Sequence, residues 1–308
     1  MKKRVGALAL VASVISFTIS ANTDFKLGMQ AAVGSLEYKS AEVFSQKISE
    51  LSNGDLSISI YPSAVLGDDR AMLQQLTMGD LGFTFASMGR VGLWIPEAGA
   101  MDLPYVVRDH QHAQKIFLSE FGQSIRDKME KDNGWRALNT WYNGTRQTTS
   151  NRPLEKIGDF DGLKLRVPNA KTLLDFARLT GASPTPMSFS EVYLALQTNA
   201  VDAQENPLHT INTMKFYEVQ SNLAMTSHLV DDTMFIASSK MWKSLNKKEQ
   251  IQVQEAADFA QEYHSKSVQD KESNLVTFFK SKGVNVTYPD VNVLRKAMSP
   301  MYAAFSEK

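Results

Sequence analysis

Residues 162–181 read GLKLRVPNAKTLLDFARLTG, and this stretch predicts a β-strand followed by an α-helix. Apolar residues at positions 163, 165 and 167 alternate with Lys164 and Arg166, which is the period-two pattern of a half-buried strand. A proline–asparagine pair ends the strand, and a helix is expected from about Thr172 to Gly181. A strand that leads directly into a helix is the building unit of α/β proteins.

The same order of elements occurs in the N-terminal part of the chain. Residues 25–31 and 56–60 have strand patterns, and apolar positions recur every three or four residues in the helix between them. A second helix is expected from about 69 to 78, before another strand that starts at Leu81. Strand and helix therefore alternate, which favours a largely parallel sheet with helices on its faces.

Two helix-to-strand connections with the same residue pattern indicate that this α/β unit occurs twice. LTMGDL (76–81) and LQTNAV (196–201) each end a helix, continue through a residue suited to positive φ, and start a strand with an apolar residue. We therefore expect an α/β protein of two similar lobes. The expected limits are 22–143 plus 232–271 for the first lobe and 144–231 plus 272–308 for the second.

A long segment near the C-terminus contains no helix breaker. Ser244 to Lys282 lacks proline and glycine, and as one helix it would reach about 55 Å at 1.5 Å per residue. Two shorter helices are the alternative. A single helix that spans both lobes explains the length better.

The first 21 residues have the layout of a secretory signal peptide. Three basic residues at positions 2–4 precede an apolar run to Ile19, and Ser20-Ala21 supplies small residues at the cleavage point. An uncleaved N-terminal anchor is the alternative interpretation. Residues 1–21 therefore predict export, and we expect the mature protein in the periplasm.

The composition excludes several classes of function. The chain has 33 basic and 33 acidic residues, and loss of the three basic residues in the signal peptide leaves a net charge of −3. This balance provides no basic surface for nucleic acid. Because the chain has no cysteine, it can form neither disulfides nor cysteine-based metal sites, and its hydrophobic core must stabilise it.

Arg166 is the first candidate for a binding residue. It lies in the strand of residues 163–167, and Asn169 follows at the carboxyl end, which is the edge where ligands bind in open α/β sheets. A guanidinium can hold a carboxylate through two parallel hydrogen bonds, whereas lysine cannot. The alternative is an arginine that pairs with a neighbouring acid on a solvated face of the sheet.

Other polar segments are candidates for the same cleft. Arg146 lies in a hydroxyl-rich stretch that could cross between the lobes, although an exposed strand would also fit. Asp69 follows Asp68 at a helix start, where one carboxylate can cap the helix while the other accepts from ligand hydroxyls. Asn206 ends a strand of the second lobe, and Phe189 could supply an apolar face for a sugar ring or acyl group.

The motifs of common enzymes are missing. The five histidines are scattered, and His110 and His112 form a close pair without a third ligand, which is a weak metal signal. The sequence contains no nucleophile elbow, no phosphate-binding loop and no dinucleotide glycine pattern. We therefore expect no catalytic residue, no metal and no cofactor, with a periplasmic sugar-acid enzyme as the alternative.

Several motifs in order resemble one transporter family. They are LGDDR (66–70), YNGTR (142–146), LRVPNA (165–170), SPTPM (183–187) and QENPL (204–208). Together these motifs are similar to the extracytoplasmic binding subunits of tripartite ATP-independent periplasmic (TRAP) transporters, and most of all to the sialic-acid-binding members. The resemblance covers essentially the whole mature chain.

The resemblance implies a flytrap fold that closes around its ligand, with a long helix spanning both lobes. It implies that Arg166 pairs with the ligand carboxylate, that Arg146 and Asn206 reinforce this contact, that Asp69 holds hydroxyls or the N-acyl group, and that Phe189 packs on the ligand. The implied partner is a sodium-driven permease of a small and a large subunit, and the binding protein itself is expected to be a monomer.

Two positions in the expected site depart from that family pattern. Ser87 stands where the sialic-acid binders usually carry an acidic residue, and Gln30 replaces an asparagine found in some members. A serine makes fewer and shorter-reaching hydrogen bonds to a polyhydroxyl tail than a carboxylate does. The expected ligand is therefore sialic acid (N-acetylneuraminate), with another organic acid such as a uronate, an aldonate or a C4-dicarboxylate as the alternative.

Overall fold

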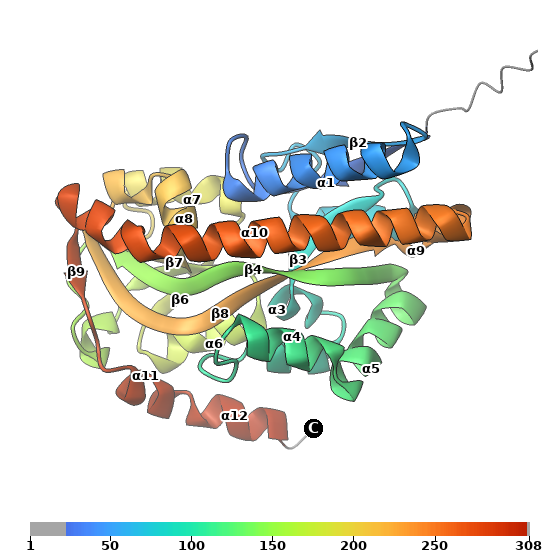
Figure 1. The fold of residues 1–308 in the computed structure, drawn as a ribbon. Helices are drawn as coiled ribbons and strands as arrows, with labels where there is room; N and C mark the ends of the chain where they lie inside the picture. Colours follow the sequence, from blue (N-terminus) through green and yellow to red (C-terminus); the bar gives the residue numbers. More distant parts are fainter. Residues whose placement is uncertain (1–22, 307–308) are drawn as a thin grey trace, which may run out of the picture.

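One mixed sheet of nine strands runs through the computed structural model, which describes residues 23–306 (Figure 1). The strand order is β2-β1-β3-β8-β4-β7-β5-β6, and β9 pairs with β8. The strands are β1 Thr23–Gly28, β2 Leu56–Tyr61, β3 Phe83–Ser87, β4 Trp135–Ser150, β5 Lys164–Val167, β6 Ser183–Pro186, β7 Ala203–Pro207, β8 Asn222–Ser238 and β9 Asn285–Thr287.

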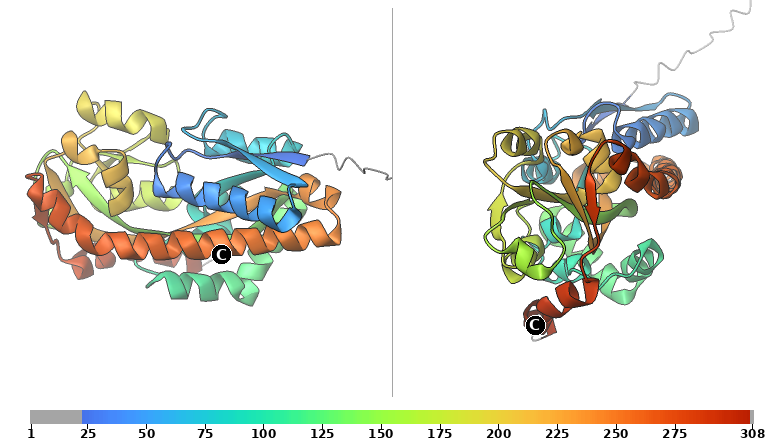
Figure 2. Two further views of the ribbon diagram at one scale, coloured as in Figure 1. Left: turned by 45° about the horizontal axis from the view of Figure 1, so that its top comes forward. Right: turned by 90° about the vertical axis from the view of Figure 1, so that its left-hand side faces the viewer.

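Helices cover both faces of the sheet, as the two further views in Figure 2 show. The α-helices are α1 Leu36–Ser52, α2 Asp69–Met78, α3 Met88–Val91, α4 His110–Leu118, α5 Glu120–Lys128, α6 Lys171–Leu179, α7 Val192–Gln197, α8 Leu208–Thr213, α9 Ser239–Ser244, α10 Lys247–Ser281, α11 Val291–Ala297 and α12 Ser299–Ser306. The expected α/β class is confirmed, and α2 has the bounds that the sequence predicts. Among residues 23–306, no helix combines the length and apolar character that a membrane span requires.

Two long strands divide the sheet into two lobes. β4 and β8 pair antiparallel along the middle, with parallel β1, β2 and β3 on one side and parallel β5, β6 and β7 with their crossover helices on the other. Each lobe has its own apolar core. Phe44 and Phe83 pack around Phe235 in the first lobe, whereas Phe160 and Phe176 lie in the core of the second. The two-lobed fold is therefore confirmed, while the exact lobe limits stay a prediction.

The segment after α9 forms one continuous helix of 35 residues, α10, rather than two shorter ones. Asn246 caps its N-terminus, and the side chain of Glu249 returns a hydrogen bond to the Asn246 backbone. Ala257 belongs to the core of the first lobe and Phe279 to a core of the second. Helix α10 therefore joins both lobes, and it lies beside α1 in each view (Figures 1 and 2).

β4 is irregular where it passes from one lobe to the other. Its register with β8 shifts between Tyr142 and Thr145, and Gly144 adopts a φ of 97°, which a side chain would strain. Glu272 of α10 accepts hydrogen bonds from the Thr145 backbone N–H at 3.0 Å and the Tyr142 hydroxyl at 2.9 Å. The long helix is therefore fastened to the sheet at this bulge.

The signal peptide expected over residues 1–21 lies outside the described residues. The first strand, β1, begins at Thr23.

Candidate functional site

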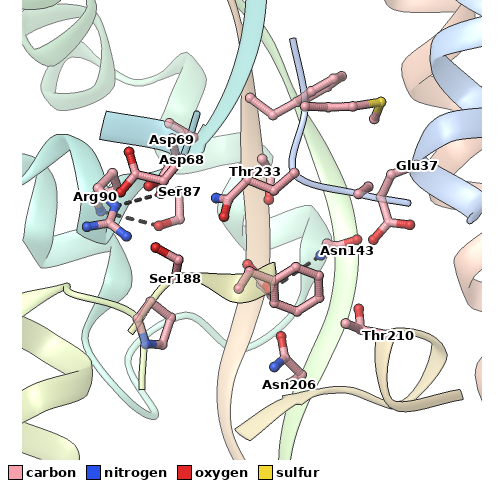
Figure 3. A pocket seen from close by; sticks show the side chains of 18 of the residues that line it. Glu37, Asp68, Asp69, Ser87, Arg90, Asn143, Ser188, Asn206, Thr210 and Thr233 are labelled. Atoms are coloured by element: carbon pink, nitrogen blue, oxygen red, sulfur yellow. Dashed lines mark hydrogen bonds and ion pairs between the residues drawn. The ribbon is translucent and has the colours of Figure 1, made fainter. Parts of the chain in front are cut away.

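A cavity of about 420 Å³ opens between the two lobes. Its walls come from the ends of β1, β3, β5 and β7, from the loops after them, and from the middle of β4 and β8. Every residue that the sequence proposes for ligand binding lines it, namely Gln30, Asp69, Ser87, Arg146, Arg166, Asn169, Phe189 and Asn206. The fold thus brings residues up to 176 positions apart in the chain into one site, which Figure 3 shows from close by.

Arg166 enters the cavity from β5 with few partners. Its neighbours Leu165 and Val167 are fully buried in the second core, and the arginine side of the strand is also covered, so that Arg166 is only 2% exposed. One Nη2 hydrogen bond goes to the backbone oxygen of Met187 at 2.8 Å, and its buried Nε has no partner. Its guanidinium carbon lies 6.0 Å from the ring centre of Phe189.

The environment of Arg166 leaves its charge poorly compensated. Burial lowers its pKa to about 10; Glu205 opposes this shift, and the neighbouring cations Arg146 and Arg90 add to it. A pKa of about 10 still leaves the guanidinium charged at neutral pH. Buried cations are as a rule paired with an anion, and the cavity gives an anion access to Arg166.

Arg146 is equally buried but fully engaged. From β4 it donates to both carboxylate oxygens of Glu205, with Nη2 to Oε1 at 2.9 Å, and its Nη1 reaches Asp231 Oδ2 at 2.7 Å. Burial opposes its charge, yet these two carboxylates raise the pKa of Arg146 above its ordinary value. Its Nη2 also donates to Asn206 Oδ1 at 3.2 Å, which fixes the amide beside the cavity.

Glu205 is the centre of this buried cluster. Burial alone would raise its pKa, but Arg146 and a 3.0 Å hydrogen bond with His228 Nε2 lower it to about 2. Glu205 is therefore an ionised counterion of Arg146, and Asp231 is its second carboxylate partner. The sequence interpretation missed both acids, although a buried arginine signals that a partner must be supplied by the fold or by a ligand.

A third arginine lies at one end of the cavity. Arg90 of α3 donates from Nε to Asp69 Oδ2 at 2.6 Å and from Nη1 to the backbone oxygen of Asn169 at 2.8 Å. The second contact connects the first lobe to the second. Asp69 is thus neutralised by Arg90, a residue that the sequence interpretation did not single out.

The neighbouring polar residues at that end also have structural roles. Asp68 caps α2 by accepting from the Ala71 backbone N–H at 2.9 Å, as its position before the helix predicts. The Ser87 hydroxyl caps α3 by accepting from the Arg90 backbone N–H at 3.2 Å. Ser87 therefore holds the start of the short helix that carries Arg90.

Asp102 is a buried carboxyl on the connection between the lobes. It lies at the end of the 3₁₀ helix η1 (Pro96–Asp102) and accepts a 2.6 Å hydrogen bond from Thr172 of α6. Burial raises its pKa to about 7, and the Thr172 hydrogen bond offsets only part of this shift. Asp102 therefore titrates near neutral pH, unlike Glu205.

Two α/β lobes that share long strands, and a cleft between them that contains a buried arginine without a counterion, are typical of the class of extracytoplasmic solute-binding proteins. The chain belongs to the family described as bacterial extracellular solute-binding protein, family 7, whose model matches residues 27–308.

Named relatives agree with this assignment. The sialic acid-binding periplasmic protein SiaP of Vibrio cholerae serotype O1 is 57% identical over 298 residues, which are 97% of this chain and 93% of that protein. The sugar acid binding protein DctPAm from Advenella mimigardefordensis, solved in complex with galactonate, matches with a TM-score of 0.88 at 30% identity, covering 92% of this chain and 93% of that one. A TRAP periplasmic solute binding protein from Polaromonas sp. JS666, bound to D-erythronate, matches with a TM-score of 0.87 at 32% identity and covers 93% and 95%.

Proposed function

We propose that this protein is the periplasmic binding component of a TRAP transporter and that it captures sialic acid, N-acetylneuraminate, through its carboxylate. The observation that carries the proposal is Arg166, a buried guanidinium in the interlobe cavity with an unpartnered Nε. The 57% identity to a sialic acid-binding protein over nearly the whole chain supports the choice of ligand.

Arg166 holds the ligand carboxylate with two parallel hydrogen bonds, from Nε and from a terminal nitrogen. Asn206, oriented by Arg146, donates or accepts beside it. Phe189 covers an apolar face of the ligand, while Asp69, Ser87, Gln30 and Asn169 contact its polar groups at the other walls of the cavity. Arg146 mainly holds Asn206 in position, because Glu205 and Asp231 already balance its own charge.

Binding would be completed by closure of the lobes about β4, β8 and α10. Closure removes water from the Arg166–carboxylate pair and so strengthens it. A membrane permease of a small and a large subunit then recognises the closed conformation. The ligand leaves unchanged, because binding and release involve no bond chemistry. Export by the signal peptide over residues 1–21 would place the mature monomer in the periplasm.

A calorimetric titration of the mature, ligand-stripped protein with N-acetylneuraminate tests the proposal. We expect one-to-one binding with a Kd in the micromolar range or below, which corresponds to about −8 kcal/mol or stronger. Mass spectrometry of the recovered ligand should show no product. Absence of heat together with an unchanged melting temperature would reject sialic acid, and a new product would reject a pure binding role.

A second candidate ligand is an aldonate or a uronate. Ser87 favours it, because this residue offers no carboxylate to a long polyhydroxyl tail and already caps α3. The solved relatives with galactonate and D-erythronate bind ligands of this class. A thermal-shift screen of sugar acids separates the two candidates, since the stronger ligand raises the melting temperature more at equal concentration.

A further inference from the structure

The wall of the cavity opposite Arg90 and Asp69 carries polar atoms without partners. Figure 3 shows Glu37, Asn143 and Thr210 together on this side, from α1, β4 and α8. Asn143 Oδ1 and Thr210 Oγ1 are buried and make no hydrogen bond to another described residue. We call this group, together with His264, which also lines the cavity, the acceptor end of the cavity.

The hydrogen bonds around Asn143 and His209 determine which of their atoms remain free. Asn143 Nδ2 donates to the Asp231 carboxylate at 3.4 Å, so the free amide atom is the oxygen, an acceptor. His209 Nε2 lies 2.6 Å from the Asn143 backbone oxygen, and a carbonyl can only accept, so Nε2 carries the proton. The other nitrogen, Nδ1, makes no hydrogen bond and faces Glu37 Oε1 at 4.0 Å, a contact that becomes an ion pair when the ring is protonated.

His264 contributes a neutral ring to this end. Burial lowers the pKa of His264 well below its ordinary value, so the ring is uncharged. Its Nδ1 lies 2.9 Å from the Ser40 hydroxyl oxygen, which also lies 2.8 Å from the Leu36 backbone oxygen. In either tautomer of a neutral imidazole, one ring nitrogen donates and the other accepts.

The acceptor end therefore contains two acceptors, the Glu37 carboxylate and the Asn143 amide oxygen, with the Thr210 hydroxyl and the neutral His264 ring able to donate or accept. We propose that this end is a specificity subsite for hydroxyl groups of the ligand, and that it excludes a second carboxylate. An additional anion would lie next to the Glu37 carboxylate, with only the uncharged Thr210 and His264 groups to donate to it. The subsite rests on the proposed function, because it requires an acid anchored at Arg166.

A cycle between protein variants and ligand analogues tests the subsite. Glu37→Gln and Thr210→Val remove an anionic acceptor and a hydroxyl with little change in volume, while Thr210→Ser retains the hydroxyl as a matched control. Each variant is titrated with N-acetylneuraminate and with its 4-, 7-, 8- and 9-deoxy analogues. We expect Glu37→Gln and Thr210→Val to bind the parent ligand about 10-fold more weakly, or about 1.4 kcal/mol, while Thr210→Ser stays within about 2-fold of wild type.

The decisive result is coupling. One deoxy analogue should bind wild type about 10-fold more weakly than N-acetylneuraminate does. Its affinity should not fall any further when wild type is replaced by Glu37→Gln or Thr210→Val, because the contact is already absent. Parent-like affinity in both variants, or independent losses for every analogue, would overturn the subsite. If wild type does not bind N-acetylneuraminate, the ligand in the proposed function is wrong, and the same cycle with D-galactonate and its monodeoxy analogues decides on the subsite alone. Melting temperatures confirm that each variant is folded.

Discussion

Arg146 and Arg166 lie in the same cavity and are almost equally buried, yet their surroundings differ. Arg146 has two carboxylate partners, Glu205 and Asp231, from neighbouring strands. Arg166 has one backbone carbonyl and an unpartnered Nε. The comparison teaches that burial alone does not identify a binding cation. Under the proposed function, the ligand supplies the partner that the fold does not give Arg166, whereas the partners of Arg146 come from the protein itself.

The largest expected effect is the loss of stability in Arg146→Met. The substitution leaves the carboxylates of Glu205 and Asp231 buried without their cation, which typically costs about 3–5 kcal/mol. The melting temperature should fall by roughly 10 °C, as measured by calorimetry without ligand. Adding Glu205→Gln to this variant should restore part of the loss. A melting temperature equal to wild type would contradict the structural role of Arg146.

The same substitution at Arg166 should have the opposite profile. Arg166→Met removes a buried cation with few partners, so the ligand-free protein should be as stable as wild type within about 1 kcal/mol. Affinity for N-acetylneuraminate should fall by about 100-fold or more, because the ligand carboxylate loses its partner in a desolvated site. Isothermal titration measures the affinity. Retained affinity would reject the carboxylate anchor, and a large loss of stability would make the two arginines equivalent.

Arg166→Lys sharpens the comparison at constant charge. An ammonium keeps the positive charge but cannot reproduce the two parallel hydrogen bonds of a guanidinium. Binding should weaken by about 10-fold or more, which is less than in Arg166→Met. Titration of both variants under identical conditions gives the difference. Equal affinity of the lysine variant and wild type would show that charge alone is recognised.

The last prediction concerns pH and the buried carboxyl group of Asp102. The pKa of Asp102 is raised from 3.8 to about 7, so the folded protein binds a proton more tightly than the unfolded chain does. Its contribution to stability is present below about pH 4 and is lost as pH rises through 7. Asp102→Asn should remove this part of the decline, whereas the part that Asp232 contributes as pH rises through about 6 should remain. Denaturant unfolding of both proteins at pH 5 and pH 8 checks it.

The groups that face Asp102 determine the control for this experiment. They are Thr172, Asp231, Arg146 and Glu205. Glu205 responds in the opposite direction, because its pKa is lowered to about 2 and its stabilisation is lost only as pH falls below about 4.5. An equal decline between pH 5 and 8 in the asparagine variant would assign the slope to another group.

Local pattern was sufficient to predict much of the fold. The alternation of apolar residues predicted β5, and the helix expected over residues 69–78 matches α2. The absence of proline and glycine predicted α10 as one continuous helix. These signals are local because a strand or helix places its own neighbouring residues on one face. All proposed ligand-binding residues were also found on the cavity wall, although their roles stay a prediction.

The missing parts of the prediction depend on contacts between distant residues. Arg146 is 59 positions from Glu205 and 85 from Asp231, and no spacing rule links them. Arg90 becomes part of the site only because the chain after β3 turns toward α2 and Asn169. Pairings of this kind follow from the order of strands in the sheet, which periodicity does not encode.

The path of α10 has a consequence for how the chain folds. The core of the first lobe combines Phe44, near the N-terminus, with Phe235 and with Val253 and Ala257 of the long helix. This core cannot be completed until more than four fifths of the chain has been synthesised or exported, because residues 253–260 are part of it. Contacts over such sequence distances slow folding, since a long loop must close before burial compensates for the lost entropy. The order of the elements along the chain therefore keeps the nascent protein open and places the formation of the binding cleft among the last events of folding.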